Sequence, residues 1–236
     1  IRPDGGVSDF KPGQYVALGL PGSSPRIQGS VLEDPTPAPD KIIKRAYSIG
    51  SSPSEKNYLE FYIAIVNEGI LTPRFAMLSE GDRVFCAPKI TGHFTLDPIP
   101  ADKNLILVST GTGLAPFISM IRTPSTWTEN RKITILHGVR YAGDLAYREE
   151  LLSLAESNPL FNYKATISRE DLEGVSRGYV QKFFIDKEIE YSAEKDHVLV
   201  CGNPSMIDDL EKLLLNEGFK VHSKKEPGNL HYEKYW

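Results

Sequence analysis

The feature that most constrains the fold is an unbroken apolar segment that runs straight into a glycine-rich turn. Residues 104–109 read NLILVS, and residues 109–116 read STGTGLAP. A short apolar run bounded by glycine is typical of a strand buried on both faces of a parallel sheet. Pro116 suits the first turn of a helix, where no N–H is needed. These residues predict a strand, a tight turn and a helix in immediate succession.

The same alternation of strand and helix continues to the end of the chain. Apolar runs predict further strands, and helical spacing of apolar residues predicts further helices, at Lys132–Val139, Leu145–Glu156, Tyr163–Ser168, His197–Cys201 and Pro204–Glu217. Strands that alternate with helices form a parallel sheet covered on both faces. We therefore predict an α/β parallel-sheet domain over residues 101–236.

Residues 1–100 follow a different pattern. Short segments rich in Val, Ile, Tyr and Phe are separated by Gly, Pro and Ser. They lie at Gln14–Leu20, Arg45–Gly50, Leu59–Val66 and Arg83–Ala87. Closely spaced short strands predict an antiparallel β-barrel or sandwich. Residues 21–40 are rich in proline and predict a long exposed loop. The opening IRPDGG is typical of a turn, so we expect either a missing first strand or a processed N-terminus.

Composition argues against several classes of protein. The formal charge of −4 argues against a nucleic-acid binder. No apolar run approaches the roughly 18 residues that cross a bilayer, and the first ten residues do not resemble a secretion signal. Cys86 and Cys201 lie far apart, and the histidines show no metal-ligand spacing. We expect a cytoplasmic protein that binds no metal, nucleic acid or membrane.

The glycine turn at residues 109–116 is the first of three motifs that indicate a ligand. Glycines let the backbone approach a diphosphate closely, and the N–H groups at a helix start point at its charge. The motif differs from the GxGxxG of dinucleotide folds, because Pro116 stands where the third glycine would be. The alternative is a tight turn without a ligand.

The second and third motifs combine aromatic and charged residues. In Arg45-Ala46-Tyr47-Ser48, the cation and the aromatic share one face of a strand, where they suit a phosphate and a flat ring. The alternative is a polar edge strand. The chain ends Glu233-Lys234-Tyr235-Trp236, although termini are normally polar and frayed. Either a planar ligand or a hydrophobic patch on the protein would cover these two aromatic residues.

In this order and spacing, the motifs resemble those of the ferredoxin–NADP reductase superfamily over nearly the whole chain. FKPGQYV is similar to its first barrel strand and turn, RAYS to its flavin-binding strand, GTGLAP to its nicotinamide-nucleotide loop and CGNP to its closing strand–helix motif. The ending EKYW and residues 59–82 resemble the bacterial ferredoxin/flavodoxin–NADP reductases in particular. The resemblance implies an FAD-binding β-barrel at 1–100 and an NADP-binding domain at 101–236.

The resemblance also implies roles for individual residues. Arg45 would hold the flavin phosphates, Tyr47 would stack on the flavin and Ser48 would bond near its N5 atom. Tyr235 would cover the other flavin face, where the nicotinamide must bind, and Trp236 would fold toward the adenine. Thr112 would lie where flavin and nicotinamide meet. The remaining flavin contacts would come from Ala46, Tyr62, Ile63, Ala64, Ile65, Ile70, Leu71 and Thr72.

Four residues would surround the reaction itself. They are Ser48, Cys201, Glu233 and Tyr235, with Glu233 as a polar neighbour of the reaction centre. Cys201 ends a strand at the edge of the site, so it either lies beside the nicotinamide or is simply a small buried hydrophobic residue. The flavin would take a hydride from NADPH and release single electrons.

The choice of coenzyme follows from the end of the second strand of the α/β domain. Domains that bind NAD usually place an acid there, to bond the ribose hydroxyls. This chain has Arg140 instead, and Ser168 and Arg169 end the next strand. The three could grip the 2′-phosphate of NADP, and they match family positions. Relatives often carry an arginine after a glycine where this chain has Tyr179, and Arg177 could substitute.

The external partner implied by the resemblance is ferredoxin or flavodoxin, which are acidic carriers. A basic run that could steer such a carrier consists of Lys220, His222, Lys224 and Lys225. The alternative is a solvated loop. We expect a monomer. Rival functions are an oxygenase-type NAD(P)H reductase and a flavin-binding sensor without turnover. The first usually carries an iron–sulfur domain, for which two cysteines are too few.

Overall fold

The computed structural model describes residues 1–128 and 130–234. They form two compact units, and the chain passes between these units more than once. One unit comprises residues 1–95 and 118–123, and the other comprises residues 96–117 and those from 124 onward. The segment 118–123 contains the end of α2 (Ala115–Ile121), which therefore belongs to the N-terminal unit.

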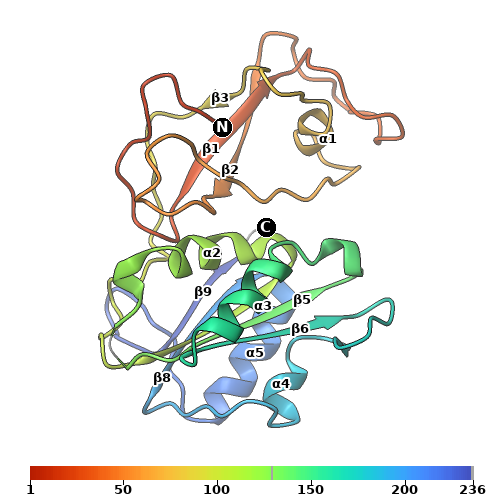
Figure 1. Cartoon of the computed structure of the whole chain (residues 1–236). Coiled ribbons are helices and arrows are strands. Elements are labelled where there is room, and N and C mark those ends of the chain that lie inside the picture. Colours follow the sequence, from red (N-terminus) through yellow and green to blue (C-terminus); the bar gives the residue numbers. More distant parts are fainter. Residues whose placement is uncertain (129, 235–236) are drawn as a thin grey trace. The chain divides into compact units, whose positions relative to one another are not determined.

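The N-terminal unit is built on a three-stranded antiparallel sheet in the order β2-β1-β3 (Figure 1). Two isolated bridges, Tyr15 to Thr91 and Ile49 to Phe61, extend the pairing beyond these strands. The predicted antiparallel architecture is thus confirmed. Its elements are β1 (Tyr15–Pro21), β2 (Ile42–Ser48), α1 (Thr72–Phe75) and β3 (Phe85–Cys86). Its core contains Phe10, Val16, Leu18, Ile49 and Leu59.

The strand predicted at Leu59–Val66 is wrong. In the described structure, only Phe61 of this segment forms a β-bridge. Ile65 and Val66 instead expose 44% and 47% of their surface. These β-branched residues suggested a strand, but in the structure their side chains form exposed apolar surface and do not belong to a sheet. Apolar side chains that gather on a surface often mark a ligand-binding site.

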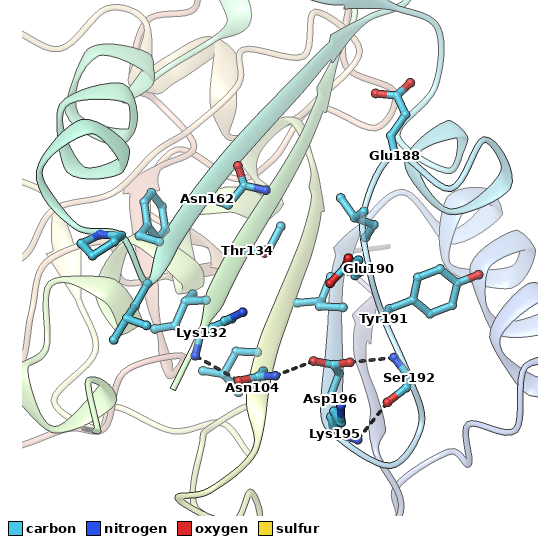
Figure 2. Close-up of a pocket in the computed structure, with 17 residues that line it drawn as sticks. Asn104, Lys132, Thr134, Asn162, Glu188, Glu190, Tyr191, Ser192, Lys195 and Asp196 are labelled. Carbon is cyan, nitrogen blue, oxygen red and sulfur yellow. Dashed lines mark hydrogen bonds between the residues drawn. The ribbon is translucent and has the colours of Figure 1, made fainter. Parts of the chain in front are cut away.

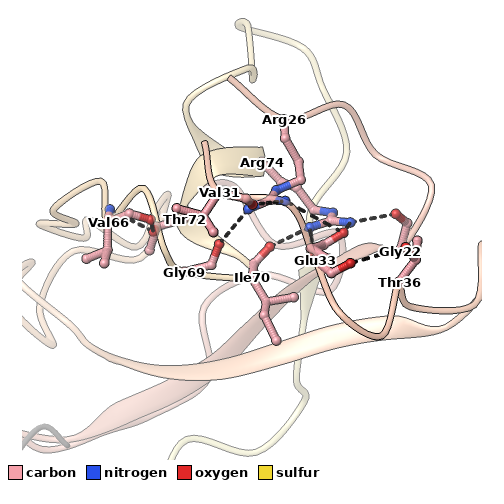
Figure 3. Close-up of polar contacts among 10 residues, drawn as sticks. All are labelled: Gly22, Arg26, Val31, Glu33, Thr36, Val66, Gly69, Ile70, Thr72 and Arg74. Carbon is pink, nitrogen blue, oxygen red and sulfur yellow. Dashed lines mark hydrogen bonds and ion pairs between the residues drawn. The ribbon is translucent and has the colours of Figure 1, made fainter. Parts of the chain in front are cut away.

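The proline-rich loop 21–40 is largely exposed, but a buried arginine anchors it (Figure 3). Arg74 of α1 is 2% exposed and forms a two-point ion pair with Glu33 of the loop. The Nη1–Oε1 and Nη2–Oε2 distances are 2.6 and 2.9 Å. Arg74 also donates hydrogen bonds to the carbonyl oxygens of Gly22 and Ile70. These polar contacts hold a loop that has little apolar surface to pack.

The second unit is a six-stranded parallel sheet in the order β7-β6-β5-β4-β8-β9. The predicted α/β domain is therefore confirmed. The sheet also contains two edge strands that the sequence analysis did not predict, the short β7 and β9. The strands are β4 (Asn104–Thr110), β5 (Ile133–Val139), β6 (Phe161–Ile167), β7 (Ser176–Arg177), β8 (Asp196–Gly202) and β9 (Leu230–Lys234).

Helices cover both faces of this sheet. Figure 1 shows α3 (Arg148–Ser157) and α5 (Pro204–Asn216) on opposite sides of it. An apolar stripe on α5 packs with α4 (Lys182–Ile185) against the central strands of the sheet. The buried residues of this cluster include Val108, Leu136, Val198, Met206, Leu210 and Leu214. Asn203 caps α5 by accepting a hydrogen bond from the Ser205 N–H, at 2.8 Å. None of the helices in the described residues has the length and apolar character that a membrane span requires.

A cavity of about 510 Å³ lies at the amino ends of the strands (Figure 2). Its lining includes the first residues of four strands, Asn104, Ile133, Phe161 and Asp196. The Asn104 amide donates a hydrogen bond to Asp196, at 3.0 Å. Ligands of open parallel sheets bind at the carboxyl ends of the strands. This cavity is therefore at the wrong edge of the sheet for a nucleotide.

Candidate functional site

The predicted glycine turn lies between β4 and α2, at the carboxyl edge of the sheet. Residues Gly111–Leu114 form a 3₁₀ turn. Gly111 has a φ of +50°, a conformation that glycine adopts without steric cost. Gly113 is required for a different reason, because a Cβ atom there would lie 2.2 Å from the carbonyl oxygen of Cys201. The turn is therefore packed directly against the end of β8.

The turn after β8 is fixed to the same place. The Asn203 N–H donates a hydrogen bond to the Thr110 Oγ1 atom, at 2.9 Å. Gly202 has a φ of +136°, and a Cβ atom on it would lie 2.3 Å from that hydroxyl oxygen. The structure thus brings together the two motifs GTGLAP and CGNP, although about ninety residues separate them.

Two of the predicted reaction-centre residues are neighbours across the sheet. Cys201 of β8 pairs in register with Glu233 of β9, and on its other side with Ser109 of β4. The Cys201 side chain is fully buried and Glu233 is half-buried. Parallel strands in register point such residues to the same face. A role for the pair beside the nicotinamide stays a prediction.

The residues predicted to read the 2′-phosphate follow the ends of adjacent strands. Arg140 follows β5. Its carbonyl oxygen accepts a hydrogen bond from the backbone N–H of Arg169, at 3.0 Å. Ser168 donates from Oγ to the Val139 carbonyl oxygen, at 3.3 Å. Both arginine side chains are exposed. Arg177 is also nearby in the sheet register, but it forms an ion pair with Asp171, at 2.7 Å.

The structure adds residues that the sequence analysis did not select. Tyr141 lies under the Arg169 guanidinium, 5.9 Å from ring centroid to Cζ, and Tyr179 is 73% exposed. Exposed aromatic rings beside cations suit a planar base that carries a phosphate. Glu170 accepts a hydrogen bond from the Ala142 N–H, so a carboxylate does lie near Arg140. The sequence alone could not show that Glu170 lies near Arg140, because Glu170 follows β6 whereas Arg140 follows β5.

In the N-terminal unit, the RAYS motif lies on β2 as an exposed-to-buried series. Arg45 and Ala46 are exposed, Tyr47 is half-buried and Ser48 is buried. The Tyr47 ring packs edge-on against Phe75, with centroids 5.5 Å apart. Burial raises the pKa of Tyr47 to about 12, so its hydroxyl stays neutral. A half-covered, uncharged ring beside an exposed cation is compatible with stacking on a flavin.

The remaining predicted flavin contacts lie in the irregular segment and at the start of α1. Ala64, Ile65 and Ile70 are exposed, and Tyr62, Ile63 and Thr72 are half-buried. The Thr72 Oγ1 atom accepts a hydrogen bond from the Val66 N–H, at 3.0 Å. The Leu71 side chain is 2% exposed within the core, so only its backbone could contact a cofactor. Tyr235 and Trp236 lie outside the described residues.

Comparison with known proteins gives the family. The model for the oxidoreductase NAD-binding domain matches residues 107–212. The flavodoxin/ferredoxin–NADP reductase of Buchnera aphidicola subsp. Baizongia pistaciae is 32% identical over 98% of this chain and 89% of its own length. The chain belongs to the bacterial ferredoxin/flavodoxin–NADP reductase family. The ferredoxin–NADP reductase of Pseudomonas aeruginosa is also 32% identical, over 95% of this chain and 86% of its own.

The fold of this chain is similar to that of a solved structure. A ferredoxin NADP⁺ reductase from Neisseria gonorrhoeae with bound FAD and NADP is similar at a TM-score of 0.80 and 23% identity. The match covers 100% of this chain and 90% of the other. That similarity confirms the predicted fold class, an antiparallel N-terminal domain followed by a parallel α/β domain.

The basic run that we expected to attract the reductase's carrier is divided in the structure. Lys220, Lys224 and Lys225 are exposed. His222 instead packs on His231, with ring centroids 4.6 Å apart. His231 in turn lies beside His197, whose Nδ1 atom is 3.0 Å from the His231 Nε2 atom. His222 is therefore better described as part of a histidine cluster than as part of the exposed basic run.

This histidine cluster predicts acid-sensitive stability. Burial, with His222 and His197 nearby, lowers the pKa of His231 from 6.5 to about 3. Burial also lowers the pKa of His197, with Lys103, His222 and Arg131 acting in the same direction and Asp102 against them. Below pH 6.5 the unfolded chain therefore binds protons that the folded chain does not. Each such histidine removes up to about 1.4 kcal/mol of stability per pH unit.

Urea unfolding at pH 7.5, 6.5, 5.5 and 4.5 measures this effect. We expect the free energy of unfolding to fall steadily below pH 6.5, and the His231→Gln variant to show a smaller slope. The His93→Gln variant is the control, because His93 is an exposed residue of the other unit. An unchanged slope in the His231→Gln variant would contradict the assignment.

Proposed function

We propose that this reductase moves electrons between NADPH and ferredoxin or flavodoxin through one bound FAD. Family membership supports the reaction class. The observation that carries the coenzyme choice is the exposed pair Arg140 and Arg169, joined through a backbone hydrogen bond at the same edge of the sheet as the glycine turn. A 2′-phosphate is dianionic near neutral pH, and two guanidinium groups suit it.

The residues present also fit FAD. The N-terminal unit combines an exposed cation, Arg45, with a half-buried neutral ring, Tyr47. Ile65, Val66 and Ile70 leave 39–47% of their surface exposed, although aliphatic side chains are usually buried. A bound isoalloxazine and ribityl chain would cover apolar surface of this kind, and Arg45 would bind the phosphates.

Bound FAD supplies the redox chemistry, because a flavin accepts a hydride and releases single electrons. The chain's residues bind and orient the reactants. Arg140 and Arg169 would hold the 2′-phosphate, and the glycine turn would hold the diphosphate. Ser48, Cys201 and Glu233 would be the neighbours of the reacting atoms, and Tyr235 would give way when the nicotinamide binds. The carrier would be acidic and would meet exposed lysines such as Lys224 and Lys225.

Cofactor release and a coupled assay test this function. We expect heat-released flavin to be FAD rather than FMN. Reduction of cytochrome c by NADPH should depend on added ferredoxin or flavodoxin from the same organism. NADPH oxidation with an artificial acceptor separates an enzyme from a flavin-binding sensor. A reductase that turns over with NADPH but with neither carrier would instead favour an oxygenase-type acceptor.

The Arg140→Ala variant tests the coenzyme site. We expect it to weaken NADPH binding by ten- to a hundredfold, because a bidentate arginine–phosphate contact contributes about 1.5–3 kcal/mol. NADH has no 2′-phosphate, so its binding should change little. The Michaelis constants of both coenzymes measure the effect. The Lys195→Ala variant is the control, because it removes one charge at the opposite edge of the sheet. Equal losses for NADPH and NADH would refute the assignment.

A further inference from the structure

A buried histidine lies directly beneath the glycine turn. His137 belongs to β5, and its side chain is 0% exposed. Its Nε2 atom is 3.2 Å from the carbonyl oxygen of Gly111, the first residue of the turn. Within the described residues, the Nδ1 atom of His137 has no hydrogen-bond partner. A buried polar atom without a partner is costly, so the residue calls for an explanation beyond packing.

The contact fixes the protonation of the ring. A carbonyl oxygen only accepts hydrogen bonds, so the Nε2 atom must carry the hydrogen. A neutral imidazole has a single N–H, which leaves Nδ1 as a bare acceptor. Burial lowers the pKa of His137 to about 4, so the ring is neutral at ordinary pH. At ordinary pH the His137 ring therefore has a single N–H group, at Nε2, and this group donates its hydrogen bond to the Gly111 carbonyl oxygen.

The Gly111 carbonyl belongs to the peptide that joins Gly111 to Thr112, and glycine restricts the rotation of this peptide less than a residue with a Cβ atom would. Glycine reaches positive φ freely, and a Cβ atom at Gly111 would meet nothing within 4 Å. The preceding residue is already fixed, because the Thr110 hydroxyl accepts a hydrogen bond from the Asn203 N–H. Rotation of the Gly111 peptide would turn its carbonyl oxygen, the negative end of the dipole, outward. At a phosphate site that orientation would repel the ligand.

We propose that His137 is a positioning residue for nucleotide binding, which holds the Gly111 carbonyl oxygen away from the phosphates. The inference rests on the proposed function, because it takes the glycine turn as the NADP site. His137 does not touch the nucleotide in this scheme. It acts through the direction of one peptide group, so it should affect the affinity for NADP and not the rate of hydride transfer.

Two variants of nearly equal size separate this role from simple packing. In the His137→Gln variant an amide N–H can replace the Nε2 donor, whereas the His137→Met variant has no donor. Both are compared with the unsubstituted, FAD-loaded full chain by calorimetric titration with NADP⁺ and by flavin reduction at saturating NADPH. We expect His137→Met to weaken NADP⁺ binding about three- to tenfold. His137→Gln should stay within about twofold, and all three should show the same saturated rate.

The outcomes distinguish the two proposals. If the unsubstituted chain does not bind NADP⁺, the proposed function fails. If it binds and His137→Met binds equally well, or both variants lose affinity equally, the role of His137 is overturned. Should the His137→Met variant fail to fold, ¹⁵N spectra of histidine-labelled, unsubstituted protein decide the matter. We expect the Nε2–H tautomer from pH 5 to 8, and an Nδ1–H tautomer or a titration in that range would overturn the proposal.

Discussion

Replacing Gly113 by alanine should destabilise the C-terminal unit by about 3 kcal/mol, at the upper end of what overpacking costs. The added Cβ atom would lie 2.2 Å from the Cys201 carbonyl oxygen and 2.6 Å from the carbonyl carbon. Both are backbone atoms of β8, which is buried along its whole length. No side chain can rotate to make room, so either the turn or the strand must move. Since the turn is the proposed diphosphate site, we also expect NADP⁺ binding to weaken at least tenfold.

Urea unfolding and calorimetric titration with NADP⁺ measure the two effects in the Gly113→Ala variant. The matched control is Gly143→Ala, in the same unit, where an added Cβ atom would have nothing within 4 Å and φ is not positive. That control should keep the stability and affinity of the unsubstituted chain. A Gly113→Ala variant as stable as the control would show that the turn does not pack on β8 as described.

The Arg74→Met variant should lose about 3–5 kcal/mol, the cost of breaking a buried ion pair by removing one partner. Glu33 would remain largely buried with only the more distant Arg26 as a cation, at 3.9 Å, and the carbonyl oxygens of Gly22 and Ile70 would each lose a donor. The Arg74 guanidinium lowers the pKa of Glu33, so this stability is present above the ordinary pKa of about 4.5 and is lost as the pH falls through the lowered value. Urea unfolding of the N-terminal unit measures the loss.

Two comparisons test the reason for that loss. Arg83→Met removes an arginine whose ion pair with Asp4 is exposed, so it should cost no more than about 1 kcal/mol. The double variant Arg74→Met/Glu33→Leu removes both buried charges and should recover much of the stability, because apolar residues often replace a buried pair without cost. If the double variant is as unstable as Arg74→Met alone, the loss of the Arg74 charge beside Glu33 is not the cause.

Much of the C-terminal unit could be predicted because its strands are buried on both faces. Such strands are continuous apolar runs, as in NLILVS, and the helix at 204–216 has a regular apolar stripe. By contrast, β9 reads LHYEK and is an edge strand, so it needs no apolar run and was not predicted. Conversely, residues 59–66 have the composition of a strand, but only Phe61 among them forms a β-bridge, and Ile65 and Val66 are exposed.

The candidate site could be predicted only where its residues lie close together in the sequence. Glycine turns and arginines are visible in the sequence because they are local. The register of Cys201 with Glu233, and the contact of His137 with Gly111, depend on which strands are neighbours. No local pattern encodes that order. In the sequence, His137 is only a polar residue within an apolar run. That its Nδ1 atom is buried without a hydrogen-bond partner can be seen only in the described structure.

The assignment of residues 118–123 to the N-terminal unit limits how the chain can be divided. The Ser119 hydroxyl donates to the Ser51 carbonyl oxygen at 2.7 Å, and Arg122 pairs with Glu60 at 2.8 Å. A fragment that ends near residue 100 would lack Ser119 and Arg122, and so would lose both of these contacts with the 50–60 segment. Chimeras that exchange one unit between reductases must therefore transplant a second, distant piece of sequence. Each unit is compact in the structure, but neither corresponds to one continuous stretch of the sequence.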